Sequence, residues 1–292
     1  MPPVKQNFVF EKIVGSDTIN KLNCLPLDCN LWEEFEFHEL AENMRQKEDE
    51  PFFNLLNRVR LGNPSNNDLN ELNSRLLNIN DKNQKIEETA TLFLEKLKQS
   101  NKTVCILPKI KDVDKFNTIV SKQLNIEIVT IDADDTKYNK RGIKKNNMNA
   151  QNKIVKNNKS LKKNNETAGL DKTLCIGIGS RVMLRRNINC ENGLVNGALG
   201  FVTKIVKNQY NHVFALDIQF DNIKSISRIE RYAAQFEVEK NIYITRHQFP
   251  INLAWAFSIH KSQGLSLDNV FIDLGEDIFQ SGMAYVALSR AR

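Results

Sequence analysis

The first third of the chain carries apolar residues at helical spacing. Within residues 31–62 they recur at intervals of three and four positions, and Gly62 followed by Pro64 marks the end of the helix. The apolar face consists of Phe52, Leu55, Leu56 and Val59. Residues 68–99 predict further helix, with apolar positions at Leu69, Leu72, Leu76, Ile86, Leu92, Phe93 and Leu97.

The pattern then changes to short apolar runs. Residues 103–108 and 126–131 predict strands, and residues 111–124 between them predict a helix. Strand, helix and strand in this order are typical of an α/β fold.

Four β-type runs separated by Gly, Asn and Asp follow residue 173, namely GSRVML, GALGFVTKIV, VFALDIQF and ISRIERYAAQFEVE. They predict a small antiparallel barrel. The end of the chain returns to the α/β pattern, with strands at 251–259 and 270–274 and a helix from about Ser281, inside which the chain stops.

Residues 137–172 interrupt this order with a stretch rich in Lys and Asn. The stretch holds 11 basic residues, two acidic residues and nine Asn, and it has no apolar period, so it predicts a disordered insertion. Two interpretations are open: a basic tether that adds salt-sensitive affinity for DNA phosphates, or low-complexity expansion in a surface loop. We favour the second, because Asn/Lys runs specify no geometry.

Charge and composition add little to this interpretation of the fold. The net charge of +6 hides a local +9 in residues 137–172, which leaves −3 for the rest of the chain, so the overall charge says little about the folded part. A hydrophobic content of 41% with 16 Phe is typical of a soluble globular protein. No run approaches the roughly 18 apolar residues of a membrane helix, and the N-terminus has neither a secretory nor a transit pattern, so we expect no membrane partner.

The cysteines form no metal or disulfide pattern. Cys24, Cys29, Cys105, Cys175 and Cys190 are an odd set without a C-x-x-C pair. They predict buried free thiols in a reducing compartment, the cytosol or the nucleus.

A polar cluster follows a buried strand within residues 254–274. The apolar run AWAFSI leads into His260, Lys261, Ser262, Gln263 and Gly264. Ligands bind at the carboxyl ends of strands in open α/β sheets, and lysine, hydroxyl and amide donors beside a glycine suit a phosphate backbone. A solvated turn is the alternative for any one of these residues alone.

Two further segments turn this cluster into a family resemblance. GSRVMLRRNINCENGLVNGALGFV (179–202) and AYVALSRAR (284–292), together with IHKSQG, resemble Pif-type superfamily-1 DNA helicases in order and spacing. MPPVKQNFVF resembles the tail of the family's third motif, and residues 40–62, with NMRQ and FFNLLNRVRLG, resemble the fourth motif and its helix. The resemblance covers nearly everything except the insertion.

The resemblance implies a two-lobed RecA-like motor that hydrolyses ATP between its lobes and moves on single-stranded DNA, usually 5′ to 3′. This chain would be the second lobe, an α/β domain with a parallel sheet flanked by helices and an inserted small SH3-like β-barrel. The implied cofactors are ATP and Mg²⁺, and the implied partners are single-stranded DNA and an N-terminal RecA-like lobe that holds the P-loop and the magnesium.

The domain boundaries follow from the motifs. We expect the tail of the first lobe at 1–30, the second lobe at 31–136, the insertion at 137–172, a lead-in at 173–202, the barrel at 203–245 and the rest of the second lobe at 246–292.

Two arginines match the family's contacts to ATP. Arg45 of NMRQ and Arg290 of ALSRAR correspond to the arginines that reach the γ-phosphate across the lobe interface, and Gln46 and Gly264 correspond to nucleotide-binding positions. Finger arginines in other NTPases contribute about 10³–10⁵ in rate. From its spacing alone, Arg45 is also compatible with a surface position on a helix.

The DNA-binding candidates also come from the resemblance. His260, Lys261, Ser262 and Gln263 match the fifth motif, which holds the DNA backbone and couples it to the ATP site, and Gly264 would permit close approach of the backbone. His260 could instead hold neighbouring residues in position without contacting DNA itself. Asn187 and Asn196 are further DNA-binding candidates, although they and Gly197 fit turn residues at the barrel entry better. Trp255 and Tyr285 fit the core or an interface better than base stacking.

The chain contains no G-x-x-x-x-G-K-[S/T] motif, so nothing in it predicts a phosphate-cradling P-loop or a metal site. The acidic run VTIDADD (129–135) follows the fourth motif, a position that argues against a magnesium role. Because the chain begins and ends within motifs, we expect a fragment of a longer helicase.

Three functions compete at this stage. The favoured one is the second lobe of a helicase for DNA repair, recombination, telomere maintenance or mobile-element replication, in the nucleus or the mitochondrion. The rivals are a non-catalytic module that binds single-stranded DNA and a decayed transposon-derived remnant. The two arginines favour the enzyme, because a DNA-binding module has no use for groups aimed at a γ-phosphate.

We predict that the 292-residue polypeptide does not hydrolyse ATP by itself. A phosphate-release assay with and without single-stranded DNA should give the same background rate for the chain and for Arg290→Ala. DNA-stimulated hydrolysis above the Arg290→Ala level would contradict this prediction.

Overall fold

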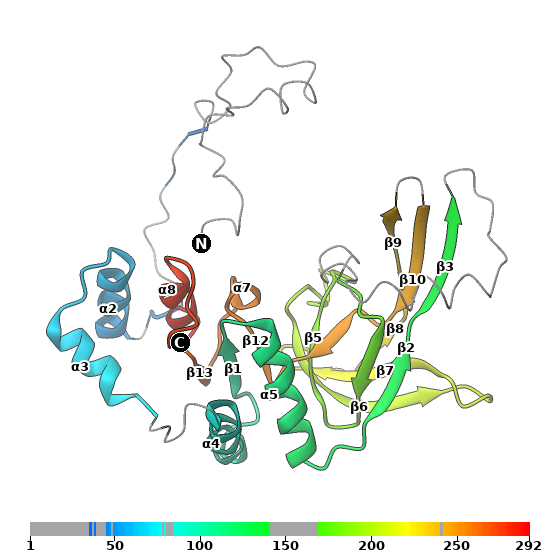
Figure 1. The fold of residues 1–292 in the computed structure, drawn as a ribbon, viewed down its shortest axis with the longest axis horizontal. Coiled ribbons are helices and arrows are strands. Elements are labelled where there is room, and N and C mark those ends of the chain that lie inside the picture. The colour runs from blue at the N-terminus through cyan, green and yellow to red at the C-terminus, as the bar shows by residue number, and fades with distance from the viewer. Residues whose placement is uncertain are drawn as a thin grey trace.

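A computed structural model provides the fold. It describes residues 35–36, 38, 45–47, 49–77, 79, 84–139, 169–239 and 242–292 (Figure 1). The predicted first-lobe tail at 1–30 and most of the insertion lie outside the described residues.

A three-stranded parallel sheet organises the half of the molecule that carries the helices. Strand β1 (Val104–Leu107) lies between β12 (Ala256–Ser258) and β13 (Val270–Ile272) and pairs in parallel with both. All four residues of β1 are buried, as expected for a strand covered on both faces. The sheet therefore joins segments about 150 residues apart in sequence.

Helices α4 (Lys85–Gln99) and α5 (Ile110–Gln123) cover one face of this sheet. Cys105 and Leu107 of β1 point into this layer, because side chains alternate along a strand. The layer also contains Phe93, whose ring meets that of Phe116 edge to face at 5.2 Å. The predicted helices and the first predicted strand are confirmed here.

The opposite face packs against α7 (Ile259–Ser262) and α8 (Met283–Leu288). Val104 and Ile106 of β1 contribute to this cluster. Figure 1 shows α7 and α8 beside the sheet, close to the C-terminus.

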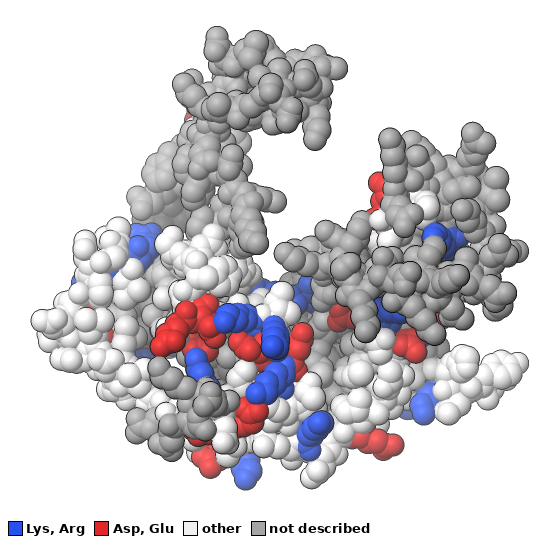
Figure 2. All heavy atoms as spheres, viewed as in Figure 1, with Lys and Arg blue, Asp and Glu red and all other residues white. Residues whose placement is uncertain are grey.

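Ion pairs hold the segment that follows β13. Lys85 Nζ lies 2.7 Å from the Asp273 carboxylate, and Lys109 pairs with Asp277. The Gly275 amide also donates to Asp273 Oδ1 at 2.9 Å. Figure 2 shows basic and acidic side chains intermixed on one face of the molecule.

The predicted strand at 126–131 does not join the parallel sheet. Strand β2 (Val129–Asp132) pairs antiparallel with β4 (Thr173–Ile176) instead. The α/β interpretation of this segment is therefore wrong beyond α5. Ile131 is buried with the antiparallel strands, and the neighbours of β1 come from the C-terminal part of the chain.

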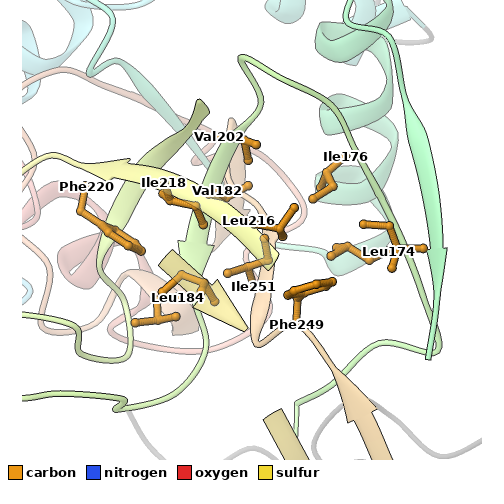
Figure 3. Close-up of a cluster of buried hydrophobic side chains, with 12 residues drawn as sticks. Leu174, Ile176, Val182, Leu184, Val202, Leu216, Ile218, Phe220, Phe249 and Ile251 are labelled. Carbon is orange, nitrogen blue, oxygen red and sulfur yellow. The ribbon is translucent and has the colours of Figure 1, made fainter. Parts of the chain in front are cut away.

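The remaining strands build an antiparallel half. One sheet has the order β11-β5-β6-β7-β8, and another has the order β3-β10-β9. Their bounds are β3 (Asp134–Asn139), β5 (Arg181–Leu184), β6 (Leu199–Lys207), β7 (Val213–Phe220), β8 (Ser227–Glu230), β9 (Tyr232–Glu239), β10 (Ile242–Gln248) and β11 (Ile251–Leu253). Figure 3 shows the apolar core that the five-stranded sheet shares with β2 and β4, with Leu216, Ile218 and Phe249 among its residues.

The antiparallel strands confirm the β-type runs but extend beyond the predicted barrel at 203–245. They begin at β2 and end at β11, so the predicted lead-in at 173–202 belongs to the sheets through β4, β5 and the start of β6. Closure into an SH3-like barrel stays a prediction.

Both ends of the predicted insertion belong to the fold. Lys137 lies in β3, and Leu170 is buried, so the described part contradicts boundaries at 137 and 172. Arg246 of β10 holds the two ends together. Its Nε and Nη2 donate to the Asp135 carboxylate at 2.8 and 2.7 Å, and its Nη1 donates to the Leu170 carbonyl at 3.1 Å.

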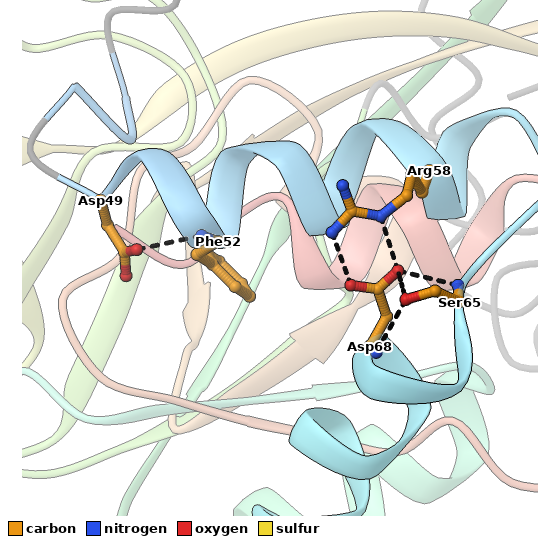
Figure 4. Close-up of polar contacts among 5 residues, drawn as sticks. All are labelled: Asp49, Phe52, Arg58, Ser65 and Asp68. Carbon is orange, nitrogen blue, oxygen red and sulfur yellow. Dashed lines mark hydrogen bonds and ion pairs between the residues drawn. The ribbon is translucent and has the colours of Figure 1, made fainter.

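Helices α2 (Glu50–Arg60) and α3 (Asn66–Ser74) form a corner around one buried carboxylate. Asp68 accepts from Arg58 Nε and Nη2 at 2.7 and 2.6 Å and from the Ser65 amide at 2.8 Å (Figure 4). These donors hold the pKa of Asp68 far below its usual value, the Arg58 hydrogen bond having the largest effect.

The predicted apolar face of α2 is confirmed, since Phe52, Leu55 and Leu56 are buried. The face predicted for the next helix is not, because Leu69 and Leu76 are 45% and 69% exposed. Leu76 lies beyond the end of α3.

The C-terminus differs from the prediction. The last helix ends at Leu288, and Ala291 then forms a parallel bridge with Leu267. The Leu267 amide donates to the Arg290 carbonyl at 2.9 Å, and the Arg292 amide donates to the Leu267 carbonyl at 3.1 Å. The chain therefore does not stop inside a helix.

The cysteines are only partly as predicted. Cys105, Cys175 and Cys190 are free, but the last two are exposed, and Cys24 and Cys29 lie outside the described residues. Burial raises the pKa of the Cys105 thiol strongly. None of the helices described here has the length and apolar character needed to cross a membrane.

A buried ion pair in the antiparallel half yields a stability prediction. Arg181 of β5 is fully buried, donates to both carboxylate oxygens of Asp221 at 2.6 and 2.5 Å, and lies over the Phe201 ring at 4.5 Å. Asp221→Asn would leave this charge uncompensated, so we expect a loss of about 3 kcal/mol in the free energy of unfolding, measured by urea denaturation.

Asp217→Asn is the matched control. Asp217 makes a similar paired contact with Arg228, whose side chain is 53% exposed, so its loss should be much smaller. Equal losses for the two variants would show that burial does not determine the cost.

Candidate functional site

The structure brings the two predicted finger arginines together. Arg45 Nε donates to Ser266 Oγ at 2.8 Å, and its Nη1 donates to the Ser289 carbonyl at 2.9 Å. The neighbouring Gln46 is buried and donates to the Ala291 carbonyl at 2.6 Å. Residues from the start of the described chain are thereby attached to its C-terminal segment.

Arg290 lies at the same place and is 8% exposed. Its Nε donates to the Val286 carbonyl at 2.9 Å, its Nη2 to Ser289 Oγ at 2.8 Å and its Nη1 to the Leu265 carbonyl at 3.4 Å. All three acceptors are neutral oxygens. Burial, followed by the charge of Arg45, lowers the pKa of Arg290.

This geometry favours an anion. The two guanidinium groups repel each other, and one of them is largely buried, so their positive charges are unfavourable in free energy. A negative group that binds near both would lower this free energy. The alternative, a surface position on a helix, is not what the structure shows, because Arg45 precedes α2 and its guanidinium group donates to Ser266 and Ser289.

The two arginines also share a support. Arg290 donates to the carbonyl of Leu265 and Arg45 to the hydroxyl of Ser266, and both acceptors lie just after the predicted DNA-binding motif. A displacement of this loop would therefore reach both guanidinium groups.

The motif itself occupies the short helix α7 and the turn after it. His260 is partly buried, and its ring stacks on that of Phe279, with centroids 6.0 Å apart and planes inclined by 20°. Its Nε2 is buried and, among the described residues, has no hydrogen-bond partner. The Phe279 stack is an interaction that can orient this ring.

Lys261 lies in a group of partly buried charges. Burial lowers its pKa most and the charge of Arg185 lowers it further, whereas Asp171 and Asp114 oppose the shift. Burial raises the pKa of Asp171, whose carboxylate accepts from Asn252 Nδ2 at 2.5 Å. Lys261 is therefore a partly buried cation beside Arg185, and lysine side chains bind phosphate oxygens.

Ser262 and Gln263 face different environments. Ser262 is fully buried and its hydroxyl donates to the Ile259 carbonyl at 2.8 Å, so the structure does not present it for the predicted DNA contact. Gln263 is exposed. Gly264 has φ +89°, and a Cβ there would meet nothing within 4 Å, so its backbone conformation accounts for the glycine here.

Asn187, Asn196 and Gly197 form a turn, as their alternative interpretation had it. The Asn196 amide donates to Asn187 Oδ1 at 2.7 Å. Gly197 has φ +94°, and a Cβ there would lie 3.1 Å from Leu265 Cδ2. The turn therefore packs against the loop that supports Arg290.

Trp255 and Tyr285 belong to the interior, as their sequence context predicts. Trp255 is 2% exposed and contacts the rings of Phe93 and Phe201 at 6.4 and 5.9 Å. Tyr285 is partly buried between the clusters around α8 and α2.

Sequence reasoning missed three residues of the site. Ser266 follows the motif by two positions, and its proximity was the only available signal. Asp171 is one of only two acidic residues in the basic stretch, and that exception could have drawn attention to it. Phe279 had no signal, because its contact with His260 depends on the folded loop after β13.

The described residues hold no group of three or more His, Cys, Asp or Glu side chains that could bind a metal ion.

The comparisons with known proteins agree on one family. The family described as DNA helicase Pif1, 2B domain, matches residues 161–205. A protein from Xenopus laevis named ATP-dependent DNA helicase PIF1 is 45% identical over 114 residues, which are 39% of this chain and 17% of that protein. Its namesake from Homo sapiens is 41% identical over 120 residues, 41% of this chain and 18% of that protein.

Solved structures extend the likeness to most of the fold. The Pif1 helicase of Candida albicans matches 86% of this chain and 53% of its own, with 25% identity and a TM-score of 0.58. The Bacteroides Pif1 helicase in complex with ADP-AlF3 and single-stranded DNA matches 88% of this chain and 50% of its own, with 27% identity and a TM-score of 0.56. The chain thus matches about half of each of these structures and under a fifth of each of the two helicases from Xenopus laevis and Homo sapiens.

The Gly197 contact generates a prediction for this site. Gly197→Ala would place a side chain in left-handed backbone, a cost of about 1–2 kcal/mol, and would also press on Leu265. Gly264→Ala has a similar φ without the contact. In urea denaturation we expect both variants to lose stability and Gly197→Ala to lose more, and the reverse order would contradict the packing described here.

Proposed function

We propose that this chain, which is similar to Pif1 helicases, is the second RecA-like motor lobe of an ATP-dependent DNA helicase that moves 5′ to 3′ on single-stranded DNA. The observation that carries the proposal is the shared support of Arg45 and Arg290 on residues 265–266, directly after the DNA-binding motif. Through this support, residues 265–266 would connect the proposed ATP site with the proposed DNA site.

ATP is the proposed ligand of the two arginines. The transferred phosphoryl group gathers negative charge on its oxygens, and fixed guanidinium groups stabilise that charge. A lysine would not reproduce this arrangement, because Arg45 and Arg290 each use several N–H groups at fixed angles. We propose that a P-loop lobe cradles the ATP phosphates and holds Mg²⁺ on the other side of the interface.

Single-stranded DNA is the proposed ligand of α7. Lys261 would contact a phosphate and the exposed Gln263 would donate to the backbone, while the buried Ser262 shapes the turn between them. The Bacteroides relative was solved with ADP-AlF3 and single-stranded DNA together, which supports this pairing of sites.

The cellular role is proposed from the family resemblance alone. We propose a helicase for DNA repair, recombination, telomere maintenance or mobile-element replication, located in the nucleus or the mitochondrion.

Salt-dependent DNA binding tests the proposal. The chain should bind a fluorescent oligothymidylate in an anisotropy assay, and affinity should fall linearly with salt on logarithmic axes. Lys261→Met should weaken binding and reduce the magnitude of the slope by about 0.7, since one phosphate contact is lost.

Two variants make the test specific. Lys98→Met removes an exposed lysine on α4 and should leave affinity and slope unchanged. Arg290→Met should retain the slope, because a group that serves ATP makes no phosphate contact with DNA. A loss of slope in Arg290→Met, or none in Lys261→Met, would overturn the assignment of the two sites.

A further inference from the structure

We propose that Phe279, stacked on His260, is a platform on which one base of single-stranded DNA stacks. This inference deepens the proposed function and rests on it. It adds a base-contacting residue to a site whose other candidates suit the phosphate backbone.

Exposure is the first observation. Phe279 is 57% exposed even though its ring contacts His260. An exposed apolar side chain alone needs no explanation. Here, however, the exposed ring adjoins the helix that carries Lys261.

The ring geometry is the second observation. The planes of Phe279 and His260 are inclined by only 20°, with centroids 6.0 Å apart, so the two rings form a short stack. A nucleobase that added to the exposed side of Phe279 would extend this stack. Base stacking on aromatic rings contributes about 1–3 kcal/mol per base, and it accepts any sequence because every base has a π-face.

The third observation is that the loop carrying Phe279 is held at several points. Lys85 pairs with Asp273 at 2.7 Å and Lys109 pairs with Asp277, two positions before Phe279. On the other side, the Met283 amide donates to the Gln280 carbonyl at 3.4 Å. A platform held in place before binding loses little freedom when a base arrives.

Charge completes the site. Lys261 follows His260 directly, and Arg185 lies close enough to lower its pKa. Proteins that bind single strands without sequence preference combine such cations, which follow the phosphates, with aromatic rings that stack the bases. The structure therefore places both kinds of contact beside α7.

The test compares Phe279→Ala with the unmodified chain in binding oligothymidylate. We expect affinity to fall by about 5- to 150-fold, the range that loss of one stacked base gives. The salt slope should stay unchanged, because an uncharged ring releases no counterions. Phe279→Trp should retain affinity, and Phe279→Leu should resemble Phe279→Ala.

Two controls isolate the base. Leu274→Ala truncates another exposed apolar residue of the same loop and should bind normally. An oligonucleotide with abasic sites should bind the unmodified chain and Phe279→Ala equally, since there is no base to stack.

The outcomes separate this inference from the proposed function. If the unmodified chain does not bind DNA, the proposed function fails. If it binds but Phe279→Ala binds equally well, the platform fails alone. A loss of the same size on the abasic strand would show that Phe279 only positions His260, and it would also overturn the platform.

Discussion

The fold depends on a strand that is buried on both faces. β1 sends Val104 and Ile106 into one apolar layer and Cys105 and Leu107 into the other, so it can be stable only if helices cover both sides. Its partners β12 and β13 come from the far end of the chain. The residues between α5 and β12 therefore lie outside this sheet, and they form the antiparallel strands. The turn that bears the candidate DNA-binding residues begins where β12 returns to the sheet.

Local patterns predicted the elements better than their partners. The apolar faces of α2 and α4, the strand β1 and the long strands β6 and β7 all follow from periodicity, because periodicity reports which face of an element is buried. Periodicity does not predict which strand pairs with β2. The apolar residues of β2 are compatible with either sheet, and pairing with β4 depends on residues some 45 positions later. The early end of α8 likewise depends on a distant backbone, that of Leu267.

The candidate site was predictable where a motif named its residues, and less so where their surroundings decide their behaviour. Arg45, Gln46 and Arg290 lie together as the resemblance implied, and Asn187 and Asn196 form the turn that their residue types suggested. Four adjacent motif residues nevertheless have four environments, from the buried Ser262 to the exposed Gln263. A one-turn helix directs neighbouring side chains roughly 100° apart, so motif membership alone cannot say which of them meets a ligand.

Arg246 has a consequence for how this chain tolerates variation. One guanidinium group binds Asp135 on the strand that leads into the Lys/Asn-rich stretch and the Leu170 carbonyl where that stretch returns. Arg246 thus holds the two ends of this stretch together, whatever the number of residues between them. The entropy of closing a loop grows only with the logarithm of its length, about 0.6 kcal/mol for each doubling. Lengthening or shortening the sequence at this point should therefore be nearly neutral for folding, which leaves it free to diverge while the folded residues on either side stay constrained.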